Sequence, residues 1–278
     1  MNMKPKGEFL ICILVAVCFS TVYGAYTNPT QITLVATPFS PPENVATWKV
    51  RLWTGFIGYL ILTIALSLLL WNSYKAWQLQ KEERRRILQY FGLYIFFYML
   101  ATLFMTIEAG VFNLWYGLSF PLAIPLSILF SGFAPFFLLK FNYWVVNREK
   151  PEIIRNLSVL LPLAVLIGFM ILQGITIVSR GLLLAVNLIA VIQVMIFVST
   201  ALREELNVMK KVSLQTLLAG LIASLGFFFF YTLDALNPVP YSVIMNFAFL
   251  SGFLASVLLF LGTVMPEWYV SWIRNHIS

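Results

Sequence analysis

The chain has 278 residues, of which 60% are hydrophobic and only 10% are charged. These proportions exclude a soluble globular domain, in which charged residues make up about a quarter of the chain. The formal net charge of +7 does not indicate a nucleic-acid partner, because the basic residues lie beside apolar segments, where anionic lipid headgroups and membrane insertion account for them.

Residues 1–25 have the pattern of a secretory signal peptide: two lysines precede an apolar run over 9–20, and small residues follow it. An uncleaved N-terminal anchor helix is the alternative, and both interpretations stay open. Both cysteines of the chain fall in this segment, so the sequence indicates no disulfide framework. Residues 26–50 contain four prolines and are expected to form a short extracytoplasmic segment.

Seven apolar segments follow. Each is long enough to cross a bilayer, whose hydrocarbon core of about 30 Å requires about 20 mainly apolar residues per helix. The fold class predicted is therefore an all-α integral membrane protein, with a seven-helix transmembrane bundle over 51–268 and a cytoplasmic tail over 269–278. The expected spans are 53–71, 88–109, 117–139, 157–178, 181–201, 214–233 and 242–264.

The polar connections between these segments alternate in charge. Those after the first, third and fifth spans carry several lysines and arginines, whereas the turns at 110–116 and 234–241 carry none. Positively charged connections stay in the cytoplasm. The alternation therefore predicts a multi-pass protein of the cell membrane, with its N-terminus outside, its C-terminus inside and the lipid bilayer as its surroundings.

The reactive side chains are few. The sole histidine is His276, close to the end of the sequence, so histidine-ligated haem, copper and zinc sites are not indicated. No span has an interior lysine for the Schiff base of a retinal protein. Only two acidic residues border the spans, Glu108 and Asp234, both at outward ends. We therefore expect no enzymatic activity, no metal and no cofactor.

Polar side chains gather in the outward halves of the expected spans. A polar group in hydrocarbon needs a partner or a wet cavity. Two interpretations stay open: hydrogen bonds between helices, or an outward-facing ligand pocket in which Glu108 pairs with Arg180 or lines the wall. The predicted ligand-binding residues are Glu108, Asn113, Gln173, Arg180, Asn187, Asp234 and Asn246.

The segment 256–272 contains Leu261-Gly262 and Pro266-Glu267-Trp268. This segment resembles the exit of prokaryotic seven-helix sensory domains, in which the last helix ends in Leu-Gly-x-x-x-Pro-x-Trp before a kinase or cyclase. The resemblance implies a receptor-like seven-helix fold and carries over no site residues. Since no output domain follows in this sequence, we expect a signal to pass to a separate membrane or cytoplasmic partner.

The sequence thus predicts a non-enzymatic membrane protein of sensory or receptor type. Two alternatives remain. The lack of catalytic groups also fits an accessory or anchoring subunit of a larger membrane complex. A small-solute transporter is the other, although midplane charges and internal repeats, which transporters favour, are not evident. The sequence does not indicate the oligomeric state.

Overall fold

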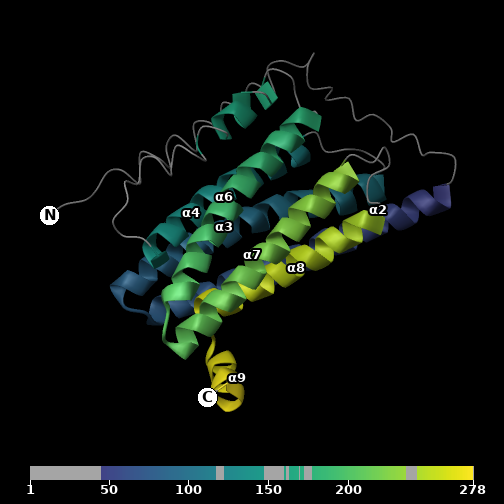
Figure 1. Cartoon of the computed structure of the whole chain (residues 1–278). Helices are drawn as coiled ribbons and strands as arrows, with labels where there is room; N and C mark the ends of the chain where they lie inside the picture. Colours follow the sequence, from purple (N-terminus) through teal and green to yellow (C-terminus); the bar gives the residue numbers. More distant parts are fainter. Residues whose placement is uncertain are drawn as a thin grey trace.

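The computed structural model describes residues 45–116, 122–146, 160, 163–168, 170–171, 177–235 and 243–277. Within these ranges the regular elements are all helices, and there is no strand, as the sequence predicts (Figure 1). The elements are α2 (Val45–Leu79), α3 (Glu82–Ile107), the π-helix η1 (Glu108–Tyr116), α4 (Ala123–Val146), α6 (Ile177–Glu204), α7 (Val208–Ala235), α8 (Val243–Val264) and α9 (Glu267–Ile277).

Among the described residues, six helices are long and apolar enough to cross a membrane: α2, α3 with η1, α4, α6, α7 and α8. The chain is therefore a polytopic membrane protein. The expected span over 157–178 lies mostly outside the described residues. Leu163, Leu166 and Met170 within it are buried against side chains of α4 and α6. The total of seven spans stays a prediction.

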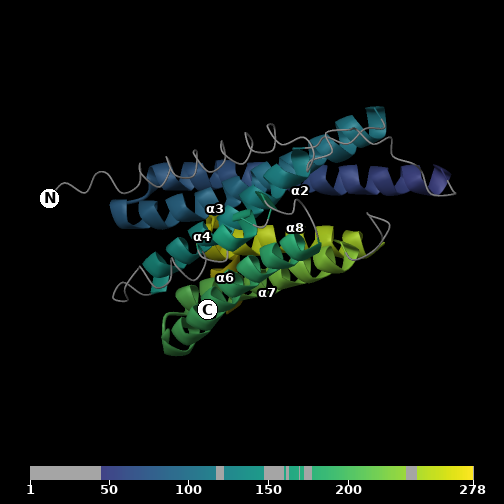
Figure 2. The same ribbon diagram turned by 90° about the horizontal axis from the view of Figure 1, so that it is seen from above.

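The helices pack mainly against their neighbours in sequence. α2 packs against α3, α3 against α4, α6 against α7 and α7 against α8, while α8 returns to contact α2. Seen from above, α2 and α3 lie on one side of the bundle and α6 and α7 on the other (Figure 2). The largest core cluster between them is built from aliphatic and aromatic side chains, including the fully buried Phe91, Phe141 and Leu221.

α7 and α8 approach each other closely at two glycines. A Cβ atom on Gly220 would lie 2.8 Å from the backbone nitrogen of Leu259, and one on Gly262 would lie 2.6 Å from that of Leu217. The Ser213 hydroxyl also donates a hydrogen bond to the Gly262 carbonyl at 2.6 Å. Small residues allow this approach in membrane bundles. α7 and α8 therefore form one closely packed unit.

Most of the described lysines and arginines gather at one end of the bundle, which we call the basic end. It contains the α2–α3 turn, the α6–α7 turn and α9 (Figure 1). This grouping agrees with the charge alternation of the sequence, and its cytoplasmic location stays a prediction. Its described basic residues are Lys75, Lys81, Arg85, Arg86, Lys140, Arg203, Lys210, Lys211 and Arg274.

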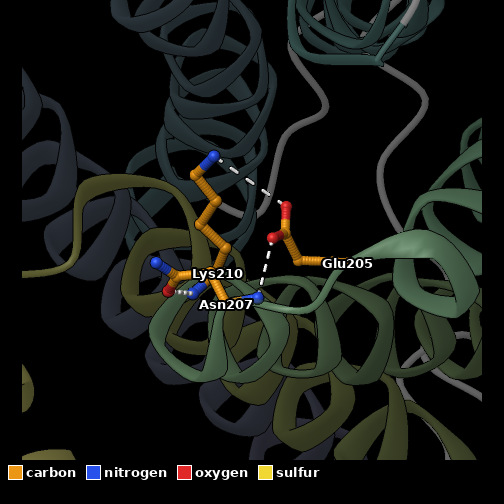
Figure 3. A network of polar contacts seen from close by, with 3 residues as sticks. All are labelled: Glu205, Asn207 and Lys210. Atoms are coloured by element: carbon orange, nitrogen blue, oxygen red, sulfur yellow. Dashed lines mark hydrogen bonds and ion pairs between the residues drawn. The ribbon is translucent and has the colours of Figure 1, made fainter.

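Side chains stabilise the α6–α7 turn and the α2–α3 turn at the basic end. In the α6–α7 turn, Asn207 Oδ1 accepts the Lys210 backbone N–H at 3.2 Å and so caps the start of α7 (Figure 3). Glu205 Oε1 accepts the Asn207 N–H at 2.9 Å, and its other oxygen lies 3.9 Å from Lys210 Nζ. In the α2–α3 turn, the Arg85 side chain donates to two carbonyls near the end of α2 at 3.1 and 3.3 Å. These contacts satisfy helix-end groups that would otherwise need water.

Most of the expected tail over 269–278 forms part of a helix, α9. A sharp turn precedes it, because Met265 has a φ of 48° in the left-handed region and Pro266 follows. The Tyr269 hydroxyl lies 2.7 Å from Thr216 Oγ1 of α7, and Ile273 is buried. One face of α9 therefore packs on the basic end of the bundle.

Candidate functional site

One face of α3 carries a hydroxyl group at every fourth residue. Tyr94, Tyr98, Thr102 and Thr106 follow this spacing, which places side chains one above another on the same face of a helix. All four are buried or partly buried, so this polar face points into the bundle. In a membrane, such groups need partners on neighbouring helices or water between them.

The hydroxyl face of α3 borders a cavity of about 60 Å³ between α2, α3, α7 and α8. Five hydroxyl-bearing residues line it: Tyr94, Tyr98 and Thr102 from α3, Ser224 from α7 and Ser256 from α8. The rest of the wall is aliphatic and aromatic, apart from one glycine. This volume suffices for a few water molecules, each of which needs about 10–15 Å³. It is smaller than ordinary ligand pockets, which measure about 300–1,000 Å³.

Four of the five hydroxyl groups that line the cavity donate their protons to other groups of the protein. Ser224 and Ser256 donate to carbonyls four residues earlier in their own helices, at 3.0 and 2.8 Å. Thr102 donates to the carbonyl three residues earlier at 3.0 Å. The Tyr98 hydroxyl donates to Asn187 on α6. The oxygen atoms of these four hydroxyl groups keep lone pairs, so the cavity wall can accept hydrogen bonds.

Asn187 on α6 connects this site to α4. The Tyr98 hydroxyl donates to Asn187 Oδ1, while Asn187 Nδ2 donates to the Leu183 carbonyl at 2.9 Å and the Ser131 carbonyl at 3.5 Å. The Ser131 carbonyl has lost its usual helical partner, because Pro135 four residues later has no N–H. Each polar atom of the buried Asn187 amide thus has a partner. Its role is to join α3, α4 and α6.

The hydroxyl face continues toward the end of the bundle opposite the basic end. Thr106 Oγ1 lies 3.1 Å from Thr63 Oγ1 of α2, and each threonine also bonds a carbonyl of its own helix. Just beyond Thr106, α3 passes into η1. Elements of this kind are rare and occur frequently at functional sites. Polar groups therefore extend from the cavity to η1 through an otherwise apolar interface.

η1 brings two of the predicted site residues together. Asn113 Nδ2 donates to the Glu108 carbonyl, five residues earlier, at 2.8 Å. Both residues are buried, and Asn113 Oδ1 has no hydrogen-bond partner in the described structure. Gly110 lets η1 lie close to α2, because a Cβ atom there would be 2.5 Å from the Phe56 ring.

The other predicted site residues that the structure describes do not line the cavity. Asp234 is buried at the end of α7, at the same end of the bundle as η1. Asn246 on α8 is exposed and so faces away from the interior. Arg180 belongs to α6, but its side chain is outside the described part, and Gln173 lies outside the described residues altogether. The expected pairing of Glu108 with Arg180 stays a prediction.

Sequence reasoning missed the hydroxyl groups that line the cavity. The sequence feature that could have revealed them is the four-residue spacing of hydroxyl-bearing residues over 94–106. It is easily overlooked because tyrosine and threonine occur widely in apolar spans. The run of phenylalanines on α7 is divided between the cavity and the outer surface of the bundle. Phe227 and Phe228 line the cavity, whereas Phe229 is 58% exposed.

No protein-family model, curated protein or solved structure matches this chain. The resemblance of its exit segment to sensory domains therefore rests on the sequence alone. Within the described part of the chain, no group of three His, Cys, Asp or Glu residues lies close enough to hold a metal ion.

Proposed function

We propose that this chain is a non-enzymatic, receptor-like membrane protein that binds a small hydrogen-bond donor in the cavity between α2, α3, α7 and α8. The observation that carries the proposal is the convergence of five hydroxyl groups from three helices on one cavity, with the protons of four of them directed to other groups of the protein. An acceptor-lined wall favours a donor such as an alcohol, a phenol or an amine over an isostere without a proton to donate.

The aromatic part of the wall favours a ligand with an apolar body. Phe91, Phe227 and Phe228 contribute rings to the cavity, and apolar contact with them adds to the polar interactions. A ligand larger than a few waters requires α7 and α8 to separate from α2 and α3. Binding would then favour the separated arrangement over the closed one, as population shift requires.

The packed α7–α8 unit would carry this change to the basic end. Close contact at Gly262 makes the two helices move together, and the Thr216–Tyr269 hydrogen bond links α7 to α9. α9 exposes Trp268 and Trp272, which offers a membrane or cytoplasmic partner a surface that depends on the position of α7. The contacts between α7, α8 and α9 are observed. That they couple ligand binding to the position of α9 is what we propose.

The test compares phenol with anisole, which share a ring but differ in the ability to donate. At about ten times its Kd, phenol should raise the Tm of the detergent-solubilised protein by about 3 °C, and anisole should raise it much less. Ser256→Ala should reduce the difference, because it removes one acceptor oxygen from the cavity wall; the Ser256 proton itself is used within α8.

Ser67→Ala is the matched control, since Ser67 makes the same bond to its own helix at 2.7 Å but does not line the cavity. This variant should respond to phenol as the unaltered protein does. Equal stabilisation by phenol and anisole, or an unchanged response in Ser256→Ala, would refute the proposed ligand class.

A fluorophore on α9 separates a receptor from a passive binder. In a background with Cys12 and Cys18 replaced by serine, a label at Ser271→Cys should change its emission when phenol binds. Tyr269→Phe should weaken that change without weakening binding, because it removes only the hydrogen bond to Thr216. A silent label in a protein that binds phenol would argue against signalling.

Transport is the second candidate, because the cavity lies near the middle of the spanning helices, where transporters hold their substrates. Vesicles containing the protein should then take up a small amine or alcohol faster than empty vesicles. Ser256→Ala should slow that uptake. A receptor, by contrast, leaves the uptake rate unchanged.

A further inference from the structure

A second hollow lies on the bundle, apart from the cavity described above. It is a groove of about 410 Å³ between α2 and α3 at the basic end. Its size falls within the range of small-molecule sites, about 300–1,000 Å³. Leu70, Leu93 and Phe96 make much of its wall apolar, and Ser73, Trp77 and Gln89 add polar groups.

Ser73 is the unusual residue of this groove. Its side chain is only 1% exposed, and its hydroxyl has no hydrogen-bond partner in the described structure. Other serines of the spanning helices, such as Ser67 and Ser224, donate to the carbonyl four residues earlier. A buried hydroxyl without a partner is unfavourable. An acceptor oxygen that enters the groove from outside the protein would satisfy it.

The groove is open where α3 has a glycine. A Cβ atom on Gly92 would meet only one atom, Leu70 Cδ1 at 3.9 Å. Trp71 and Tyr74 on the same stretch of α2 are exposed, as expected for aromatic residues at a membrane interface. The groove therefore has an apolar floor and lies at the level where lipid headgroups meet acyl chains.

Positive charge surrounds the end of the groove. The segment 75–86 contains five basic residues and two acidic ones, a balance of three positive charges. Lys75 Nζ lies 5.3 Å from the Trp71 ring centroid, and Arg85 Cζ lies 5.3 Å from that of Trp77. Lys81 in the turn is exposed. Basic sites between spanning helices attract anionic lipid headgroups.

We propose that this groove binds an anionic phospholipid. One acyl chain lies between α2 and α3 along Leu70 and Phe96, and an ester or phosphate oxygen accepts the Ser73 hydroxyl proton. The phosphate stays close to Lys75 and Lys81. Free inorganic phosphate would satisfy the charge but not the apolar floor, so the occupant is the whole lipid. The site is independent of the proposed ligand cavity.

The test adds dioleoyl phosphatidylglycerol or dioleoyl phosphatidylcholine to the full chain in detergent and measures the Tm and the retention of lipid by native mass spectrometry. Phosphatidylglycerol should bind more tightly than phosphatidylcholine. Gly92→Leu should lower the phosphatidylglycerol affinity by at least about fivefold, because the new side chain fills the groove. Gly181→Leu is the control, since a Cβ atom at Gly181 also meets open space but on α6.

Ser73→Ala gives a second readout, which replacement of a merely structural serine would not change. It should lower the phosphatidylglycerol affinity by about fivefold and leave the lipid-free protein at least as stable as before, because the alanine leaves no unsatisfied hydroxyl. Lys75→Gln with Lys81→Gln should reduce the preference for phosphatidylglycerol. Equal binding of the two lipids, or unchanged binding in Gly92→Leu, would overturn the proposal.

Discussion

Asn187 shows how one buried amide can serve as structure rather than as a binding group. Its oxygen and nitrogen contact α3, α4 and its own helix, and the Ser131 carbonyl needs it because Pro135 offers no N–H. From sequence, Asn187 could have been interhelical glue or part of a pocket. Its contacts favour glue, and they also hold Tyr98 beside the cavity.

Replacing Asn187 by alanine should therefore destabilise the protein. The Tyr98 hydroxyl and the Ser131 carbonyl would be left buried without partners, so the free energy of unfolding should fall by about 1–3 kcal/mol. Thermal or denaturant unfolding in detergent measures the change.

Asn246→Ala is the matched control, because Asn246 has the same side chain but is exposed on α8. A surface change of this kind should alter stability by less than about 0.5 kcal/mol. Equal effects of the two substitutions would contradict the linking role assigned to Asn187.

At the scale of the element, the close approach of α7 and α8 depends on glycines that have no room for a side chain. Gly262→Ala would place a Cβ atom 2.6 Å from the Leu217 backbone nitrogen, and backbone atoms cannot move aside as a side-chain end can. Overpacking of this kind costs about 1–3 kcal/mol. The Tm of Gly262→Ala should fall accordingly.

The comparison variant is Gly168→Ala, at a helical glycine where a Cβ atom meets nothing within 4 Å. Alanine favours helix over glycine by about 1 kcal/mol, so this variant should be neutral or slightly stabilised. A stable Gly262→Ala protein would mean that the two helices can shift apart freely.

The existence of the spanning helices could be predicted from the sequence, but several of their details could not. Apolar length identifies α6 and α8 with nearly the observed ends, whereas α2 runs to Leu79 because helix-forming residues continue it past the membrane. The turn expected at 110–116 is wrong, because these residues continue the span as η1. Nothing in the hydropathy of 108–116 indicates a π-helix. α9 was overlooked because a short helix depends on packing, here through Ile273 and Tyr269.

The candidate site was less predictable than the fold. Glu108 and Asn113 do lie together, as polar residues near one depth suggest. Asn246 shares that depth but faces outward, because depth alone does not determine the side of a helix. The cavity depends on how α3, α7 and α8 pack, and the sequence offers no direct measure of that packing.

At the scale of the whole molecule, the basic end defines an axis along which the protein can be oriented. We expect this end to face the cytoplasm. In a cysteine-free background, Gln78→Cys at the α2–α3 turn and Val243→Cys at the start of α8 are both exposed and lie at opposite ends. A membrane-impermeant maleimide applied to intact cells should label Val243→Cys and leave Gln78→Cys unlabelled until the cells are opened. Labelling of Gln78→Cys but not of Val243→Cys on intact cells would mean that the basic end faces outward, opposite to the proposed orientation.

The placement of charge also bears on the membrane potential. Among the described residues, charged side chains lie near the ends of the spanning helices, and the middle of the bundle carries none. Moving one elementary charge across the field is worth about 2.3 kcal/mol per 100 mV. The proposed separation of α7 and α8 from α2 and α3 moves no charged side chain across the field. The membrane potential should therefore not change the free energy of this separation. Phenol binding measured in vesicles should thus be the same with and without an imposed diffusion potential. A cell could depolarise or hyperpolarise without altering the proposed ligand binding.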